Sequence, residues 1–89
     1  MITMNKKGFI FLDVGNVEDP KKIATRILDR YLDKETDYCC TVVGKYTIVV
    51  EKFISDLPEI DELLAKIRQD DKINPVIKKA TTFIGVQQA

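Results

Sequence analysis

The sequence predicts an α+β fold, because short apolar segments typical of strands alternate with segments of helical periodicity. With 89 residues the chain is long enough for one hydrophobic core and too short for two. Hydrophobic residues make up 45% and charged residues 31%, a balance typical of a folded domain. We therefore expect one domain over residues 8–89, preceded by an N-terminal tail of residues 1–7.

The first half of the chain predicts a strand and a helix. Residues 8–14 are apolar at almost every position and rich in branched and aromatic side chains, which indicates a strand covered on both faces. Asp19 is suited to cap a helix that begins at Pro20, and apolar residues then recur at helical spacing. This pattern predicts a helix over residues 20–32.

A β-hairpin is predicted next. Residues 38–43 and 46–53 are rich in the side chains that strands favour. Between them, Gly44 and Lys45 indicate a tight reversal, because glycine adopts backbone angles that other residues resist.

The last third predicts a second helix and a final strand. Asp56 and Glu59 resemble a capping box for a helix that ends near Arg68, and residues 76–86 indicate a strand. The order strand, helix, strand, strand, helix, strand then gives two right-handed crossovers around a hairpin. We expect a ferredoxin-like βαββαβ domain, with a four-stranded antiparallel sheet and both helices on one face.

Strand alternation sorts the sheet residues into two faces. One set is aliphatic and suited to lie under the helices: Ile10, Leu12, Val14, Ile48, Val50, Ile84 and Val86. The opposite set is apolar with polar neighbours: Phe9, Phe11, Val49 and Phe83 beside Asp13, Thr47, Thr81 and Glu51. Three phenylalanines form too large an apolar patch to stay in water, so we expect a homodimer with these faces packed together, a dimeric α+β barrel. A register shifted by one residue would exchange the two faces.

Several kinds of chemistry have no support in the sequence. The chain has no histidine, its four glycines are scattered, and its net charge is zero, so catalytic triads, phosphate loops and direct nucleic-acid binding are not expected. The acidic residues near Glu59 suit a helix N-terminus, and Asp70 with Asp71 suits a solvated turn. We expect no metal, no cofactor and no enzymatic activity.

The cysteines and the absence of targeting segments suggest a cytoplasmic protein. Cys39 and Cys40 are adjacent and would point to opposite faces of a strand, which favours small hydrophobic residues in a reducing compartment over a redox or metal site. No apolar run is long enough to cross a membrane or to serve as a signal peptide.

Two segments carry a family resemblance. The hairpin sequence VVGKYTIVV of residues 42–50 resembles the Gly-x-Tyr-Asp turn in the effector domain of the Lrp/AsnC (feast/famine) transcriptional regulators. Residues 74–84 are similar to that family's last strand, where a proline turn leads to a basic residue and a Thr-aromatic-aliphatic run. The resemblance extends from Gly8 to Val86. The family's helix-turn-helix has no counterpart here, so we expect a stand-alone effector (RAM, regulation of amino acid metabolism) domain.

This resemblance implies a function in transcriptional regulation. It implies dimers that assemble into larger rings, an amino acid or related small molecule held between dimers near the hairpin, and co-assembly with DNA-binding relatives. The ligand-binding residues it implies are Val43, Gly44, Tyr46, Thr47 and, from the last strand, Thr82. Thr47 stands where the family usually has an aspartate, so a charge-assisted contact to a ligand's ammonium group would be missing.

Other interpretations remain open at the level of sequence. The domain could be a purely structural oligomerisation adaptor, which the missing aspartate favours. A small enzyme of the dimeric α+β-barrel type would use Tyr38, Tyr46 or Arg26 in a closed apolar cavity. An amino-acid-binding ACT domain has the same element order, but its usual glycine motif after the first strand is absent.

Overall fold

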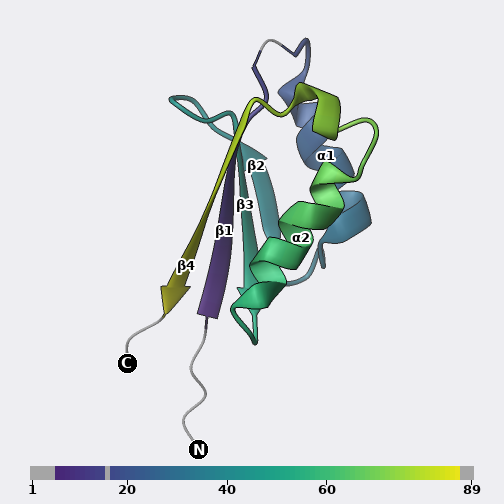
Figure 1. Cartoon of the computed structure of the whole chain (residues 1–89). Helices are drawn as coiled ribbons and strands as arrows, with labels where there is room; N and C mark the ends of the chain where they lie inside the picture. Colours follow the sequence, from purple (N-terminus) through teal and green to yellow (C-terminus); the bar gives the residue numbers. More distant parts are fainter. Residues whose placement is uncertain (1–5, 16, 87–89) are drawn as a thin grey trace, which may run out of the picture.

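The computed structural model describes residues 6–15 and 17–86. Its elements follow the predicted order, and Figure 1 shows them coloured along the chain. They are β1 (Lys6–Asp13), α1 (Pro20–Tyr31), β2 (Tyr38–Thr41), β3 (Ile48–Ile54), α2 (Pro58–Arg68), the short 3-10 helix η1 (Asn74–Val76) and β4 (Lys79–Val86).

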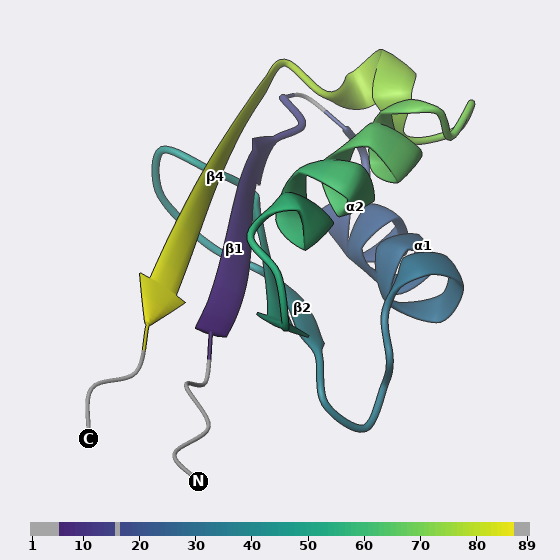
Figure 2. The same cartoon turned by 60° about the horizontal axis from the view of Figure 1, so that its bottom comes forward.

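The sheet has the strand order β2-β3-β1-β4, and every neighbouring pair is antiparallel. Both helices cover the same face of this sheet, as the two views in Figures 1 and 2 show. The ferredoxin-like α+β arrangement predicted from the sequence is therefore confirmed. The other face of the sheet carries no described helix.

The core lies between the sheet and the helices. Ile10 and Leu12 of β1 and Ile48 and Val50 of β3 are fully buried, in line with the predicted aliphatic set. The helices contribute the apolar residues at their sheet-facing positions to the same cluster: Ala24, Ile27, Ile60, Leu63 and Ile67. The predicted strand register, which places Ile10, Leu12, Ile48 and Val50 on the face toward the helices, is thus correct, and the alternative register shifted by one residue is excluded.

The prediction that Ile84 and Val86 lie buried under the helices is wrong. The β1–β4 register places Ile84 opposite Gly8 and Val86 opposite Lys6, on the helix side of the sheet. Ile84 is nevertheless 39% and Val86 42% exposed. Because β4 is an outer strand, the helices do not extend far enough to cover the end of it.

The two helix starts differ in how they are capped. The Asp19 side chain accepts a hydrogen bond from the Lys21 backbone N–H at 3.1 Å, so the predicted cap of α1 is confirmed. At α2 the N-cap position is Leu57, which makes no side-chain bond, and the predicted Asp56 cap is wrong. Glu59 still reaches back, but it accepts from the Ser55 backbone N–H at 2.8 Å, one residue before the N–H that the expected capping box would use.

The strand boundaries need three corrections. β1 begins at Lys6, so the last two residues expected in the N-terminal tail belong to the sheet, whereas residues 1–5 lie outside the described residues. The tight reversal at Gly44 and Lys45 is wrong, because residues 42–47 form a six-residue hairpin loop between β2 and β3. β4 begins at Lys79 rather than near Val76, since the Asn-Pro segment forms η1. None of the helices in the described part of the chain is long and apolar enough to cross a membrane.

Candidate functional site

The face of the sheet opposite the helices is the first candidate site, and we call it the open face. The strand registers place alternate residues of all four strands on it. These residues are Lys7, Phe9, Phe11 and Asp13 of β1, Tyr38 and Cys40 of β2, Val49, Glu51 and Phe53 of β3, and Lys79, Thr81, Phe83 and Gly85 of β4.

Aromatic rings form the centre of the open face. Phe11 lies 5.5 Å from Phe83, 5.6 Å from Tyr46 and 6.5 Å from Phe9, measured between ring centroids. Such pairs contribute roughly 0.5–1.5 kcal/mol each beyond simple burial. Phe83 remains 56% exposed in the chain by itself. These rings thus form an apolar surface that remains exposed to water in a single chain.

Charges of both signs lie at the two ends of this surface. At one end, the Lys7 ammonium is 4.0 Å from the Glu51 carboxylate and 5.0 Å from the centre of the Phe53 ring. At the other end, Asp13 pairs across the strands with Lys79. The open face is therefore apolar in the middle and balanced at the Lys7 end, whereas at the loop end Asp13 offsets only one of the two lysines Lys79 and Lys45.

The hairpin loop, residues 42–47, is the second candidate site. The Val42 N–H donates to the Thr47 carbonyl at 2.8 Å, and the Thr47 N–H donates to the Leu12 carbonyl at 2.8 Å. These bonds anchor the base of the loop. Gly44 at the tip has φ 141°, and a Cβ there would have no neighbour within 4 Å. The tip therefore needs glycine for its backbone angle and not for lack of space.

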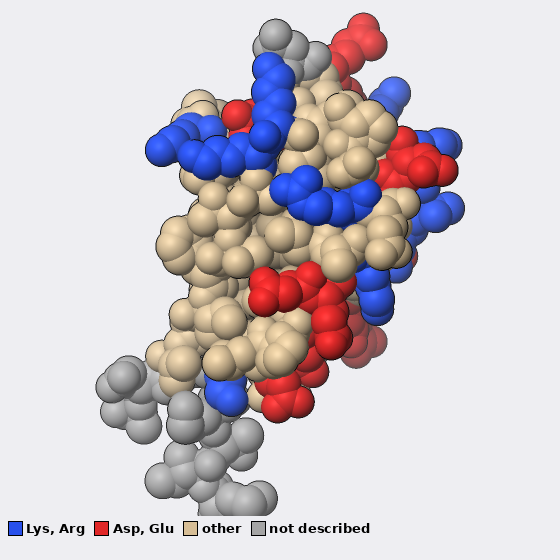
Figure 3. Space-filling model, in the orientation of Figure 1, with Lys and Arg blue, Asp and Glu red and all other residues tan. Residues whose placement is uncertain are grey.

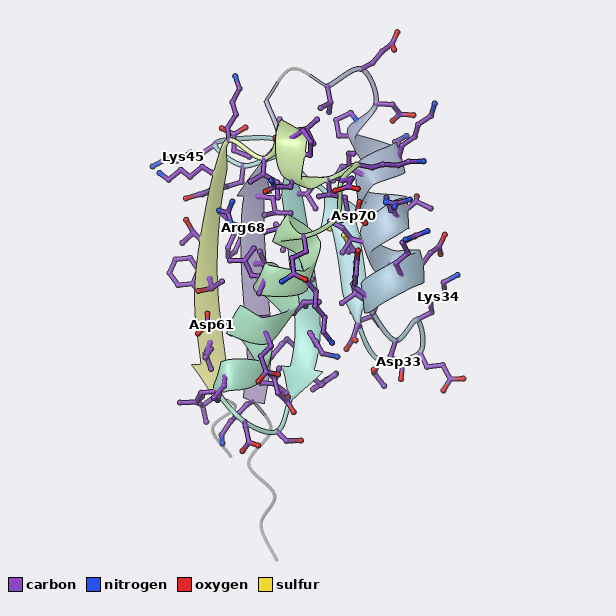
Figure 4. All side chains as sticks on the ribbon, turned by 45° about the vertical axis from the view of Figure 1, so that its right-hand side comes forward. Asp33, Lys34, Lys45, Asp61, Arg68 and Asp70 are labelled. Atoms are coloured by element: carbon purple, nitrogen blue, oxygen red, sulfur yellow. The ribbon has the colours of Figure 1, made fainter. Side chains whose placement is uncertain are left out.

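The loop bends across the sheet and reaches β4, although it connects the strands at the other edge. Figure 1 shows it projecting past β4, and Figure 4 shows Lys45 on the far side of the sheet from Asp70 and the helices. Tyr46 makes this contact, since its hydroxyl lies 2.9 Å from the Thr81 hydroxyl. The Lys79 ammonium lies 5.8 Å from the centre of the same ring.

The environment of Tyr46 changes its acidity. The hydrogen bond with Thr81 lowers the pKa of the Tyr46 phenol, burial opposes this, and the nearby Lys79 and Lys45 charges lower the pKa further. The hydroxyl already has a partner within the chain. A ligand that uses this hydroxyl as its anchor would have to share it with Thr81 or replace it.

The five predicted ligand-binding residues do not all lie together. Val43 and Gly44 form the exposed tip of the loop, and Tyr46 and Thr47 form the arm that returns to β3. Thr82 lies opposite Ile10 and so faces the helices, away from Tyr46. The residue of β4 that meets the loop is Thr81. The alternation of residues along the last strand predicts that Thr81 lies on the open face. No local sequence pattern indicates that the hairpin loop reaches it.

Two buried carboxylates hold the scaffold together. Asp70 accepts from the Arg26 Nε–H at 2.9 and 3.1 Å, from the Tyr31 hydroxyl at 2.7 Å and from the Lys72 backbone N–H at 2.9 Å. The expectation that Asp70 sits in a solvated turn is therefore wrong, because it is only 6% exposed. Arg26, one candidate for an enzyme pocket, has its Nε–H engaged in this structural pair.

The protonation of the Asp70 cluster follows from these contacts. Burial by itself would raise the pKa of the Asp70 carboxyl, but hydrogen bonds from Tyr31 and Arg26 outweigh it and hold that pKa well below its ordinary value. The hydrogen bond to Asp70, together with burial, raises the pKa of the Tyr31 phenol. The cluster thus contains a charged Arg26–Asp70 pair that joins α1 to the turn after α2.

Asp37 is the second buried carboxylate, and it fixes the segment that leads into β2. It accepts from the Lys52 ammonium at 3.2 Å, from the Phe53 backbone N–H at 3.3 Å and from the Asp33 backbone N–H at 2.9 Å. These contacts tie the loop after α1 to the end of β3. Asp37 lies between the predicted helix over residues 20–32 and the predicted strand over residues 38–43, and the sequence pattern did not indicate this role.

The two cysteines differ in environment. Cys39 lies opposite Val50 and packs against the core, and burial raises the pKa of its thiol to about 12. Cys40 is exposed on the open face, opposite Val49. Across residues 6–15 and 17–86 no group of three or more histidine, cysteine or carboxylate side chains comes together as a metal would require.

Two surface hollows lie along α1. One of about 290 Å³ runs between α1 and β2 and is lined in part by Ala24, Leu28 and Cys39. Another of about 460 Å³ lies on the outer face of α1 among charged side chains. Both are open to solvent, whereas the small-enzyme interpretation calls for a closed apolar cavity.

The fold has a solved counterpart. The crystal structure of hypothetical protein PHS023 from Pyrococcus horikoshii is similar to this chain with a TM-score of 0.65, and it covers 93% of this chain and 92% of its own. The two sequences are 17% identical, so this similarity establishes a shared fold. No family model matches the sequence, and no curated protein is significantly similar to it in sequence.

Proposed function

We propose that the chain is a regulatory oligomerisation module that pairs with a second copy through the open face and responds to a small molecule at the hairpin loop. The observation that carries the proposal is the aromatic cluster of Phe9, Phe11 and Phe83, with Val49 beside Phe11, on a sheet face without a described covering element. An apolar surface of this kind is typical of an interaction site.

The size of the open face fits a dimer interface. The four strands have 8, 4, 7 and 8 residues, and at about 3.4 Å per residue and about 4.8 Å between strands they cover a flat area of roughly 440 Å². Two such faces in contact remove roughly 900 Å² from water, close to the roughly 1,000 Å² that is the minimum for a specific interface. Side-chain relief adds to this area.

The charge pattern favours a second copy over a charged partner. Lys7 with Glu51 balances one end of the open face, and at the other end Asp13 leaves an excess of one positive charge from Lys79 and Lys45. A polyanion would gain little from such a face, because nucleic-acid affinity depends on an excess of cations. A two-fold axis lets the lysines of one copy approach the carboxylates of the other.

The hairpin loop supplies the sensing part of the proposal. Val43 at its tip is fully exposed, and Gly44 has no close neighbours, so one chain alone gives a ligand little to contact there. A second pair of chains brought against the loops would complete a site for an amino acid or related small molecule. This arrangement follows the Lrp/AsnC effector domains that residues 42–50 resemble, and the module would act on DNA-binding relatives by co-assembly.

A purely structural adaptor is the second candidate function. The Tyr46 hydroxyl is already paired with Thr81, and Thr47 offers no carboxylate for a ligand ammonium group. In this case the loop would only shape the assembly.

A thermal-shift screen of the twenty amino acids, run with light-scattering mass measurements, tests the proposal. A sensing module gives a higher Tm or a changed mass with at least one amino acid. No response with any of them removes the sensing part and favours the adaptor. The Thr47→Asp variant is the matched comparison, since a response gained only in this variant shows that the natural chain lacks the required charge.

A further inference from the structure

The outer edge of β4 is a surface that the open-face dimer does not use. β4 is the last strand in the order β2-β3-β1-β4, and it pairs on one side with β1. Within residues 6–15 and 17–86, no strand pairs with its other side. Alternate backbone N–H and C=O groups along this side are therefore free to bond with another strand.

Apolar side chains are exposed on both faces at the end of β4. Phe83 points to the open face, whereas Ile84 at 39% and Val86 at 42% exposure lie on the helix side. Packing two open faces together covers Phe83 but leaves Ile84 and Val86 in water. These two side chains thus require a separate explanation.

β4 also lacks the features that usually keep an edge strand from pairing. Natural edges are made short, carry charges or proline, or contain bulges. The seven residues from Ala80 to Val86 contain no charge and no proline, and β4 spans eight residues in total. Figure 3 shows basic side chains at the upper end of this edge of the molecule and uncharged surface below them. The opposite edge strand, β2, is protected by its length of four residues.

We propose that β4 pairs antiparallel with β4 of a second copy, which joins two sheets into one continuous eight-stranded sheet. The charge at Lys79 selects this orientation. Antiparallel pairing places the two Lys79 side chains at opposite ends of the paired strands, about 27 Å apart, whereas parallel pairing would place them side by side.

Antiparallel pairing also covers the exposed helix-side residues. With the two-fold axis near Phe83, Ile84 lies across from Thr82 of the partner subunit, and Val86 lies across from Ala80 of the partner subunit. The two open faces become neighbours in one larger surface. The proposal does not rest on the open-face dimer, so the two interfaces are separable by mutation.

Lysine substitutions at the edge test the proposal. The double variant Ile84→Lys with Val86→Lys adds charge to the outer strand without touching a buried residue, and light scattering then reports the mass of the assembly. We expect this variant to have half the mass of the wild-type assembly. Leu57→Lys, at an exposed position before α2, is the control that lies outside both interfaces and keeps the wild-type mass. An unchanged mass in the double variant would overturn the proposal.

Amide hydrogen exchange measured on the wild-type chain tests the same pairing without a variant that could fail to fold. Pairing protects the outward-pointing β4 amides, so their exchange slows by at least about tenfold as protein concentration rises through assembly. Concentration-independent exchange along β4 contradicts the pairing.

The Phe11→Glu variant separates this proposal from the open-face dimer, because Phe11 lies on the inner strand β1. If Phe11→Glu lowers the mass and the lysine pair does not, the edge proposal fails and the open-face dimer stands. If only the lysine pair lowers the mass, the edge pairing stands and the open-face dimer fails.

Discussion

At the scale of single residues, Asp70 is the clearest case of a side chain whose role depends on distant partners. It lies 44 positions from Arg26 and 39 from Tyr31 in the sequence, and the fold brings all three together. The sequence shows two acidic residues in a turn, which is typical of a solvated surface. Burial of one of them depends on tertiary packing, so local sequence patterns do not predict it.

The lowered pKa of Asp70 predicts an acid-dependent stability. Because the folded-state pKa lies below the unfolded value of about 3.9, the charged form stabilises the folded chain. This contribution is fully present above the unfolded pKa and is lost as the pH falls through the folded pKa. We expect the Tm of the wild-type chain to fall steadily below about pH 4, and the Asp70→Asn variant to have a lower Tm at neutral pH.

The matched control for this prediction is Asp71→Asn, at the exposed neighbouring position. Differential scanning calorimetry from pH 7 down to pH 2 gives the Tm of all three proteins. The Tm difference between wild type and Asp70→Asn should shrink toward low pH, while Asp71→Asn follows the wild type. A difference that stays constant with pH means that Asp70 does not act through its charge.

At the scale of elements, the contact between β1 and α2 depends on the small size of Gly8. A Cβ at Gly8 would lie 2.6 Å from Cδ1 and 2.9 Å from Cγ1 of Ile60, which is buried in the first turn of α2. The helix approaches the strand this closely because no side chain intervenes.

The Gly8→Ala variant is therefore expected to be less stable by about 1–3 kcal/mol, because the core must shift to admit the methyl group. Gly85→Ala is the control, since its Cβ would lie 3.3 Å from Phe9 on the open face, and we expect a change below about 1 kcal/mol. Urea unfolding of both variants measures the free energy. Equal losses of unfolding free energy in the two variants would show that close packing of α2 against Gly8 is not the cause.

The elements themselves could be predicted well from the sequence, and their contacts less well. The helical spacing of Ile23, Ile27 and Tyr31 and the alternation along β1 determine which residues face the core, because burial on one face imposes that period. The path of the hairpin loop was not predictable. It depends on Tyr46, two residues before β3, reaching Thr81, which is 35 positions away in the sequence and lies on the other side of β1.

The exposed end of β4 was missed for a related reason. Its alternation matches that of a covered strand, so Ile84 and Val86 were assigned to the core. Whether a helix covers a strand depends on the strand order, and here β4 lies outside the reach of α2. For such a residue, the sequence alternation predicts the correct face of the sheet but not how far the side chain is buried.

At the scale of the whole molecule, the chain divides its apolar surface between one buried layer and one open layer. The buried layer lies between the sheet and both helices, and it accounts for the folded monomer. The open layer contains Phe9, Phe11 and Phe83 and is the basis of the proposed self-association. The net charge of zero adds no long-range repulsion between copies.

The central claim is that two copies pair through the open face, and sedimentation equilibrium of wild type beside Phe11→Glu tests it most directly. A carboxylate at Phe11 would lie in the middle of the apolar surface, whereas Leu57→Glu places the same charge at an exposed position before α2. We predict at least a dimer mass for the wild type at micromolar concentration, a lower mass for Phe11→Glu and an unchanged mass for Leu57→Glu. A wild-type chain that sediments as a monomer, or a Phe11→Glu variant that keeps the wild-type mass, would contradict the account.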